Sequence, residues 1–438
     1  MAAVDVDGGL WATGANLYGQ RGDGTETQIA AFKKVMNGVD IVAVGMGHIM
    51  AVKKDGTLLA AGLNNLGQLG DGTKTNSKTF KQVMTDVKFV STDYFHTMVV
   101  KKDGTLWATG PNHFGNLGDG SNTLRNTFKQ VMTGVKTVST GFSHTMLIKQ
   151  DGSLWATGMN SHGQLGDGST TNRNTFKQVM TGVKDVSAGG YHTTVIKQDG
   201  SVWATGENTK GQLGDGTKTN RNTFKKVTPS HNKKCTAIGA GHAHTVAVCD
   251  HGRLYVTGDN NRGQLGNGKT SDRNVWGGVE QFGLTSVAAG YYNSAIIKNH
   301  HLRITGDNKQ GQLGLGRKKM NRKIGNTVYT HEQRYQLIFF DECEEDSCKG
   351  CVNPDNPKPT CRTESSGKEF CYFPRHCAPK DAYPNPEFKN LLKGIYIAGS
   401  HSYDEYYKID SCDTEAKCYD VLPAGIKPTL SKPKLRPS

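Results

Sequence analysis

The stretch from Asp151 to Gly168 reads Asp-Gly-Ser-Leu-Trp-Ala-Thr-Gly-Met-Asn-Ser-His-Gly-Gln-Leu-Gly-Asp-Gly, and related stretches occur seven times along the chain. Each copy contains a glycine, a variable residue and an asparagine: Gly14-Ala15-Asn16, Gly62-Leu63-Asn64, Gly110-Pro111-Asn112, Gly158-Met159-Asn160, Gly206-Glu207-Asn208, Gly258-Asp259-Asn260 and Gly306-Asp307-Asn308. The position upstream holds Trp11, Leu59, Trp107, Trp155, Trp203, Tyr255 and Arg303, so the numbering advances by 48 at every step except one of 52. A fixed period of roughly 20 to 50 residues indicates a repeat architecture.

Each unit is typical of short strands joined by tight turns. The apolar runs are rich in Val, Thr, Ile and Trp, and Gly, Asp or Asn bounds them. Asp151-Gly152 lies between two such runs, which is a strong signal for a hairpin. No amphipathic helical pattern of useful length occurs in residues 1–316. About four strands per unit suits one blade of a β-propeller, so the sequence predicts an all-β fold with seven blades.

The same repeat, with Gly141-Phe142-Ser143-His144-Thr145 before it, resembles the repeat of the regulator of chromosome condensation family. The resemblance covers roughly the first three quarters of the chain. It implies a seven-bladed β-propeller, which agrees with the number of repeats.

The two ends of the repeat region predict how the ring closes. Residues 2–6 align with the strand that precedes Asp-Gly in other units, and residues 395–399 resemble the strand before that one. We therefore expect these segments to pair in one composite blade; the alternative is that native sequence precedes Met1. The predicted organisation is propeller repeats at 1–329, a cysteine-rich insertion at 330–394, closing strands at 395–420 and a Pro/Lys-rich tail at 421–438. No signal peptide or membrane-spanning segment is recognisable, and no membrane insertion is predicted.

The ten cysteines favour a disulfide framework. They are Cys235, Cys249, Cys343, Cys348, Cys351, Cys361, Cys371, Cys377, Cys412 and Cys418. Cys235 and Cys249 flank the turn around Gly241-His242 at nearly equal distances, which predicts a disulfide across two hairpin strands. The other pairings stay open, and zinc bound by Cys348, Cys351 and His376-Cys377 is the competing interpretation. Disulfides predict an extracellular or cell-surface protein, with a nuclear or cytoplasmic location as the alternative.

The net charge of +14 is partly organised by the repeat. A basic residue follows each Gly-Asp-Gly-like loop, and a lysine comes three or four residues later in four units. This basic collar comprises Lys78, Arg125, Arg173, Arg221, Arg273 and Arg322, followed by Lys81, Lys129, Lys177 and Lys225. Equivalent positions share one side of a ring, so the collar predicts an anionic partner, namely an acidic protein or an acidic polymer such as a glycan. Nucleic acid is less well supported because aromatic residues do not alternate with the basic ones. The alternative is a solvated surface copied by duplication.

Recurring histidines and aspartates have structural explanations. His48, His96, His144, His192 and His244 lie one blade apart, beyond the reach of a shared metal ion, and Asn293 takes the sixth place. We expect these side chains to form hydrogen bonds at strand starts. Each Gly-Asp-Gly loop offers one carboxylate, too few for calcium, and suits an Asx-type turn. The sequence predicts no catalytic residues, no metal site and no cofactor.

Two functions are consistent with these features. The first is a non-enzymatic protein-interaction or structural scaffold outside the cell, which binds a protein or an anionic polymer through its propeller loops and the cysteine-rich insertion. The second comes from the resemblance alone: guanine-nucleotide exchange on a small GTPase, with chromatin contact, is the activity of the family's founding protein. The cysteine-rich insertion fits a reducing compartment poorly.

Overall fold

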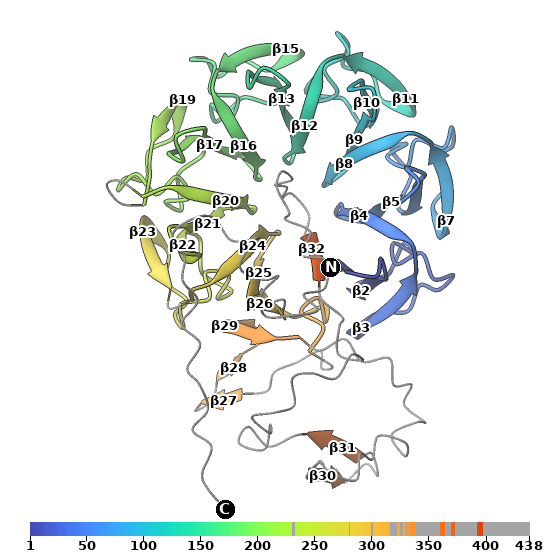
Figure 1. The fold of residues 1–438 in the computed structure, drawn as a ribbon, viewed down its shortest axis with the longest axis vertical. Coiled ribbons are helices and arrows are strands. Elements are labelled where there is room, and N and C mark those ends of the chain that lie inside the picture. The colour runs from blue at the N-terminus through green and yellow to red at the C-terminus, as the bar shows by residue number, and fades with distance from the viewer. Residues whose placement is uncertain are drawn as a thin grey trace, which may run out of the picture. The chain divides into compact units, whose positions relative to one another are not determined.

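The computed structural model describes residues 1–229, 233–279, 281–298, 301–315, 322–324, 327–329, 331–338, 360–363, 369–372 and 392–396. Its ring is built from seven four-stranded antiparallel sheets, which confirms the predicted seven-bladed β-propeller (Figure 1). The described residues form no helix, and therefore none that is long and apolar enough to cross a membrane. The chain divides into two compact units, Met1–Ser402 and Tyr403–Ser438, and the ring lies in the first.

We number the blades 1 to 7 in chain order, starting from the blade that contains Met1. The innermost strands, from blade 1, are β32 (Leu392–Tyr396), β4 (Val39–Val44), β8 (Val87–Asp93), β12 (Val135–Thr140), β16 (Val183–Ala188), β20 (Cys235–Ala240) and β24 (Leu284–Ala289). The second strands are β1 (Ala2–Asp5), β5 (His48–Lys53), β9 (His96–Lys101), β13 (His144–Lys149), β17 (His192–Lys197), β21 (His244–Cys249) and β25 (Asn293–Lys298). The third strands are β2 (Leu10–Gly14), β6 (Leu58–Gly62), β10 (Leu106–Gly110), β14 (Leu154–Gly158), β18 (Val202–Gly206), β22 (Arg253–Gly258) and β26 (His301–Asp307). The outer strands are β3 (Ile29–Met36), β7 (Ser77–Met84), β11 (Arg125–Met132), β15 (Arg173–Met180), β19 (Arg221–Lys226), β23 (Arg273–Val279) and β29 (His331–Leu337).

The two ends of the ring meet in blade 1. Strand β1 pairs with β2 on one side and with β32 on the other, where Ala3 lies opposite Ile395 and Val4 opposite Gly394. This confirms the predicted closure by an N-terminal and a C-terminal strand. Closure matters because every blade then packs between two neighbouring blades, and only short, protected sheet edges remain.

Two strands of the ring fall inside the segment predicted as the insertion. They are β29, the outer strand of blade 7, and the first part of β32. Two further hairpins join β27 (Arg322–Ile324) to β28 (Thr327–Tyr329) and β30 (Thr360–Thr363) to β31 (Glu369–Tyr372). Residues 397–438, which include most of the predicted closing segment and the tail, lie outside the described residues.

Histidines link successive blades from blade 2 to blade 7, as expected for a structural role. His144 Nε2 lies 3.0 Å from Thr193 Oγ1 of the following blade, and that hydroxyl donates to the Gln164 carbonyl at 2.7 Å. The hydroxyl therefore accepts from the imidazole, which places the proton of the neutral ring on Nε2. Equivalent bonds join His48 to Thr97, His96 to Thr145, His192 to Thr245 and His244 to Ser294 at 2.9–3.1 Å. Burial lowers the pKa of all five imidazoles to about 3.

The apolar core lies between neighbouring sheets. Met146 and Ile148 of blade 4 pack with Val186 and Val195 of blade 5, and all four side chains are buried. Full burial of one such side chain stabilises the fold by about 1.5–3 kcal/mol relative to exposure. Each blade thus needs both of its neighbours, which is why the ring has to close.

The predicted cross-strand disulfide is present. Cys235 on β20 lies opposite Cys249 on β21, and their sulfur atoms are bonded at 2.01 Å. Cys361 and Cys371 are likewise opposite each other on β30 and β31. The remaining six cysteines, Cys343, Cys348, Cys351, Cys377, Cys412 and Cys418, lie outside the described residues, as does the zinc alternative.

Candidate interaction site

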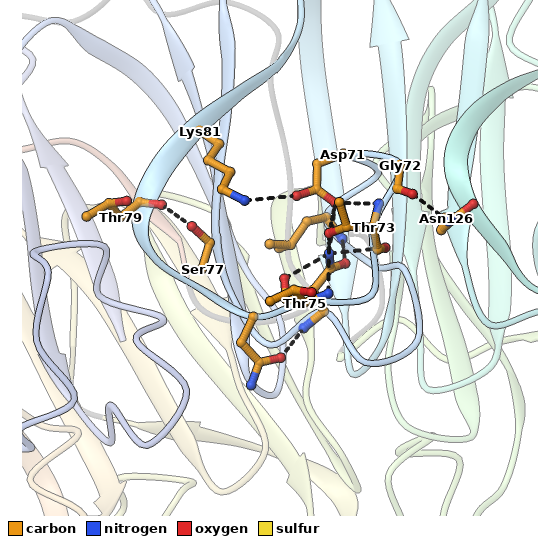
Figure 2. A network of polar contacts seen from close by, with 11 residues as sticks. Asp71, Gly72, Thr73, Thr75, Ser77, Thr79, Lys81 and Asn126 are labelled. Carbon is orange, nitrogen blue, oxygen red and sulfur yellow. Dashed lines mark hydrogen bonds and ion pairs between the residues drawn. The ribbon is translucent and has the colours of Figure 1, made fainter.

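The loop after each third strand is held by its buried asparagine. In blade 4, Asn160 Oδ1 accepts from Leu165 N at 3.0 Å, and its Nδ2 donates to Asp167 Oδ1 and to Ser169 O at 3.1 Å. Figure 2 shows the corresponding loop of blade 2, where Asp71 accepts from Thr73 and Asn126 of the next blade donates to Gly72 O at 2.7 Å. The Gly-x-Asn motif therefore fixes the loop and directs the aspartate towards the outer strand.

That aspartate binds the arginine of the predicted collar in three blades. Asp167 and Asp215 accept from Nε of Arg173 and Arg221 at 2.5 Å, with a terminal guanidinium nitrogen also at 2.5 Å. Asp119 and Arg125 form the same pair in blade 3. We call these three pairs the arginine clamps. Burial by itself would raise the pKa of Asp167, but hydrogen bonds from Ser169 and Arg173 lower it to about 2.

The clamps change how the collar presents its charge. Each arginine is neutralised by its own loop, and the lysine four residues later lies 3.5–3.6 Å from the same carboxylate. The side chains of Lys129, Lys177 and Lys225 are about half exposed. Because one aspartate pairs with both an arginine and a lysine, each of these blades keeps a net charge of about +1 on the collar. Binding of an anionic polymer by the collar stays a prediction.

Two collar members do not occupy the predicted position. The residue opposite Gly62 is Ser77, whereas Arg125 lies opposite the equivalent Gly110, so Lys78 is displaced by one residue. Successive side chains of a strand point to opposite faces, and Lys78 instead pairs with Glu26 at 3.0 Å. Arg322 begins β27, because the β27–β28 hairpin precedes the outer strand β29 of blade 7. The sequence spacing therefore does not place Arg322 at the start of the outer strand, because the connection to that strand is longer in blade 7.

A cluster of aromatic rings at one mouth of the ring was not predicted from the sequence. Its members lie on the loops between the innermost and second strands or directly beside them, in blades 3 to 7. The mouth cluster comprises Tyr94, Phe142, Tyr191, His242, Tyr291 and Tyr292.

The mouth cluster crosses the central axis. Tyr94 of blade 3 and Tyr291 of blade 7 are not in neighbouring blades, yet their ring centroids are 5.6 Å apart. Tyr94 meets Phe142 edge-on at 4.2 Å, and His242 stacks on Tyr291 at 4.2 Å. Such offset and edge-to-face pairs are each worth about 0.5–1.5 kcal/mol beyond the area they bury. The rings therefore form one rigid aromatic surface over the end of the channel.

Part of this surface is open to solvent, whereas Tyr94 is buried at 7 % exposed. Tyr291 is 41 % exposed, and Met46, on the equivalent loop of blade 2, is 63 % exposed. Burial, with a contribution from Tyr292, raises the pKa of Tyr291 to about 12, so its hydroxyl is neutral at physiological pH. Burial also raises the pKa of the Asp93 carboxyl to about 8. The mouth thus offers aromatic side chains and an exposed methionine, which are residue types enriched where proteins bind each other.

A signal for the mouth cluster does exist in the sequence. The residues just before each recurring histidine, or before Asn293 in its place, differ between units: Met46-Gly47, Tyr94-Phe95, Phe142-Ser143, Gly190-Tyr191, His242-Ala243 and Tyr291-Tyr292. They are variable and aromatic inside an otherwise regular repeat. Among the side chains that the structure describes, no group of three or more His, Cys, Asp or Glu residues is arranged to hold a metal ion.

The model of one protein family, the RCC1-like domain, matches residues 42–336. The chain belongs to this family. Prp20p from Saccharomyces cerevisiae is 17 % identical, with a TM-score of 0.67 over 77 % of this chain and 88 % of that protein. Human WBSCR16 is 18 % identical, with a TM-score of 0.64 over 72 % of this chain and 85 % of that protein. Identities this low establish the shared propeller fold alone. No curated protein sequence matches the chain.

Proposed function

We propose that this RCC1-like propeller is a non-enzymatic interaction scaffold that binds a partner protein at its mouth. The observation that carries the proposal is the aromatic cluster at the mouth, in which exposed Tyr291 packs across the axis against buried Tyr94. Rigid aromatic side chains contribute large contact areas at low entropic cost, and they dominate the binding energy of many interfaces.

Apolar exposure continues from the cluster to blades 1 and 2. Met46 is joined by Leu17 and Tyr18, which are 71 % and 41 % exposed, and Tyr18 lies against Gly47 beside Met46. Contiguous exposed apolar surface on a folded protein marks sites of interaction. The recurring histidines, in contrast, donate to buried hydroxyls, and this role favours a scaffold over acid–base catalysis.

The test compares mouth variants with equally exposed apolar residues elsewhere. Val275 is 48 % and Phe282 52 % exposed, and neither belongs to the mouth cluster. We expect Tyr291→Ala with Met46→Ala to lose a specific partner in quantitative affinity purification from the native source. Val275→Ala with Phe282→Ala should retain it. Equal retention by both double variants refutes the proposal.

We also propose that the protein is extracellular. The Cys235–Cys249 disulfide supports this, because structural disulfides persist in oxidising compartments. The measurement is the intact mass of the native protein after alkylation, with and without prior reduction. Ten cysteines that resist alkylation until reduction support the proposal; free labelling of most of them refutes it.

Guanine-nucleotide exchange on a small GTPase is the second candidate. Its support is the fold shared with Prp20p, a protein described together with its binding to Gsp1p and histones. The disulfide argues for the first candidate. Release of a labelled guanine nucleotide from a small GTPase, accelerated by this protein, would establish the second.

A further inference from the structure

Blade 6 lacks the carboxylate of the arginine clamps. Arg273 begins β23 opposite Gly258, as Arg173 begins β15 opposite Gly158 in blade 4. The loop residue six positions before Arg273 is Asn267, whereas Asp167 stands six positions before Arg173. The asparagine keeps the loop intact, because its Oδ1 accepts from Asn260 Nδ2 and from Lys269 N at 3.1 Å.

The substitution removes the acceptor for the guanidinium. The Asn267 amide nitrogen stands where the clamps have their second carboxylate oxygen, and both it and the guanidinium are hydrogen-bond donors. Arg273 instead lies over Gly277, where a side chain would overlap its guanidinium. Its Nε is buried and has no hydrogen-bond partner among the described residues. A buried polar group without a partner is destabilising, so an acceptor that reaches this guanidinium is favoured.

A second arginine flanks the same loop. Asn267 forms a backbone bridge with Arg334 of blade 7, and the equivalent bridges of Asp71, Asp119 and Asp167 are to threonines. The Arg334 side chain is exposed, with its Nε 3.0 Å from a β-carbon placed on Gly268. The nearby Asp272 is already engaged, since it pairs with Lys210 at 3.4 Å and accepts from Asn260 N at 3.0 Å.

We propose that Arg273 and Arg334 at the blade 6 loop form a binding site for a carboxylate side chain of an acidic segment of the partner protein. The inference rests on the proposed function and names a second contact outside the mouth. A carboxylate fits because the arginine clamps of blades 3 to 5 bind one, with Nε and a terminal nitrogen of the guanidinium both donating to a single carboxylate oxygen. Charge-assisted contacts at a rim also speed encounter and set orientation.

The test uses a fluorescent hexaglutamate peptide and fluorescence anisotropy. We expect Asn267→Asp to weaken its binding by at least about tenfold, because the new carboxylate occupies Arg273. Asn172→Asp adds the same charge at an exposed loop position of blade 4 and should weaken binding by less than about twofold. Arg334→Gln should also weaken binding, because it removes the second guanidinium of the site.

Three results would overturn the proposal: equal effects of Asn267→Asp and Asn172→Asp, unchanged binding by a folded Arg334→Gln variant, or binding of a sulfated oligosaccharide with no binding of hexaglutamate. Asn267→Asp should also raise Tm, which shows whether the clamp formed. Mouth variants should bind hexaglutamate as the wild type does. Failure of this site is therefore distinguishable from failure of the proposed function.

Discussion

Replacing His144 by asparagine should change how the stability of the protein depends on pH. His144 is fully buried between blades 4 and 5, and burial lowers the pKa of its imidazole from 6.5 to about 3. Blade 7 carries Asn293 at the equivalent position, so the ring already accommodates asparagine there. The substitution therefore removes one buried titrating group while a polar side chain remains.

The expected magnitude follows from proton linkage. The pKa of folded His144 lies below the unfolded value, so its contribution to stability is complete above pH 6.5 and is lost as the pH falls towards 3. One proton of difference changes the free energy of unfolding by about 1.4 kcal/mol per pH unit. Between pH 7.5 and 5.0 the wild type should lose about 2 kcal/mol at this residue, and the variant none. At pH 7.5 the variant should be less stable by about 1–3 kcal/mol, because the bond to Thr193 is lost.

The assay is urea unfolding followed by tryptophan fluorescence at pH 7.5 and pH 5.0. The stability difference between wild type and His144→Asn should shrink by about 2 kcal/mol at the lower pH. His113→Asn, at an exposed loop position, is the matched control and should follow the wild type at both values. A His144→Asn difference that is equal at the two pH values would refute the buried, neutral imidazole.

Three further predictions concern the disulfide, a glycine and a clamp. Replacing Cys235 and Cys249 by serine should lower the free energy of unfolding by about 3 kcal/mol, because the bond closes a loop of 14 residues; a loss below about 1 kcal/mol in urea unfolding would contradict this. Gly141→Ala should cost about 1–3 kcal/mol and lower Tm, because a methyl group would overlap the His144 ring; an unchanged Tm would show that the loop can shift. Arg221→Gln should cost about 1–3 kcal/mol at neutral pH by leaving buried Asp215 without its fork. Hydrogen bonds and Arg221 lower the pKa of Asp215 against the effect of burial. The loss of stability in Arg221→Gln should therefore decline as the pH falls below the ordinary aspartate value of 3.8. Thermal unfolding of wild type and variant at pH 7 and pH 3 measures this decline.

Local signals in the sequence were sufficient to predict the blades and the Cys235–Cys249 disulfide. Strand–turn–strand units such as β13 and β14 are joined at Asp151-Gly152, and Gly152 has a φ of +78°, which few other residues adopt readily. Cys235 and Cys249 are related by a single hairpin, so counting outwards from the turn places them opposite each other. Both inferences depend only on neighbours within about fifteen residues.

For the collar, repeat spacing in the sequence did not predict the position of every side chain or which charges are neutralised. Lys78 differs from the arginine position by one residue, and a displacement of one reverses the face of a strand. Arg125 was predicted to offer its charge to a partner, but Asp119 takes it through a fork whose geometry depends on the buried asparagine of the loop. Sequence spacing places a charge on a rim without showing which groups neutralise it.

By itself, the sequence determined the number of blades, the hairpins within them and the closing pair of strands, because the repeat encodes each blade through short-range turns and alternation. The tertiary structure alone decided how the rings of the mouth cluster meet and which charges of the collar are neutralised. Tyr94 and Tyr291 are almost two hundred residues apart, and their rings meet only because seven blades close around one axis. Arg173 and Arg273 hold the same place in the repeat, and only the structure shows that Asp167 binds the first, whereas Nε of the second has no hydrogen-bond partner among the described residues. Contacts that arise from ring closure and from side-chain direction have no signature in local spacing.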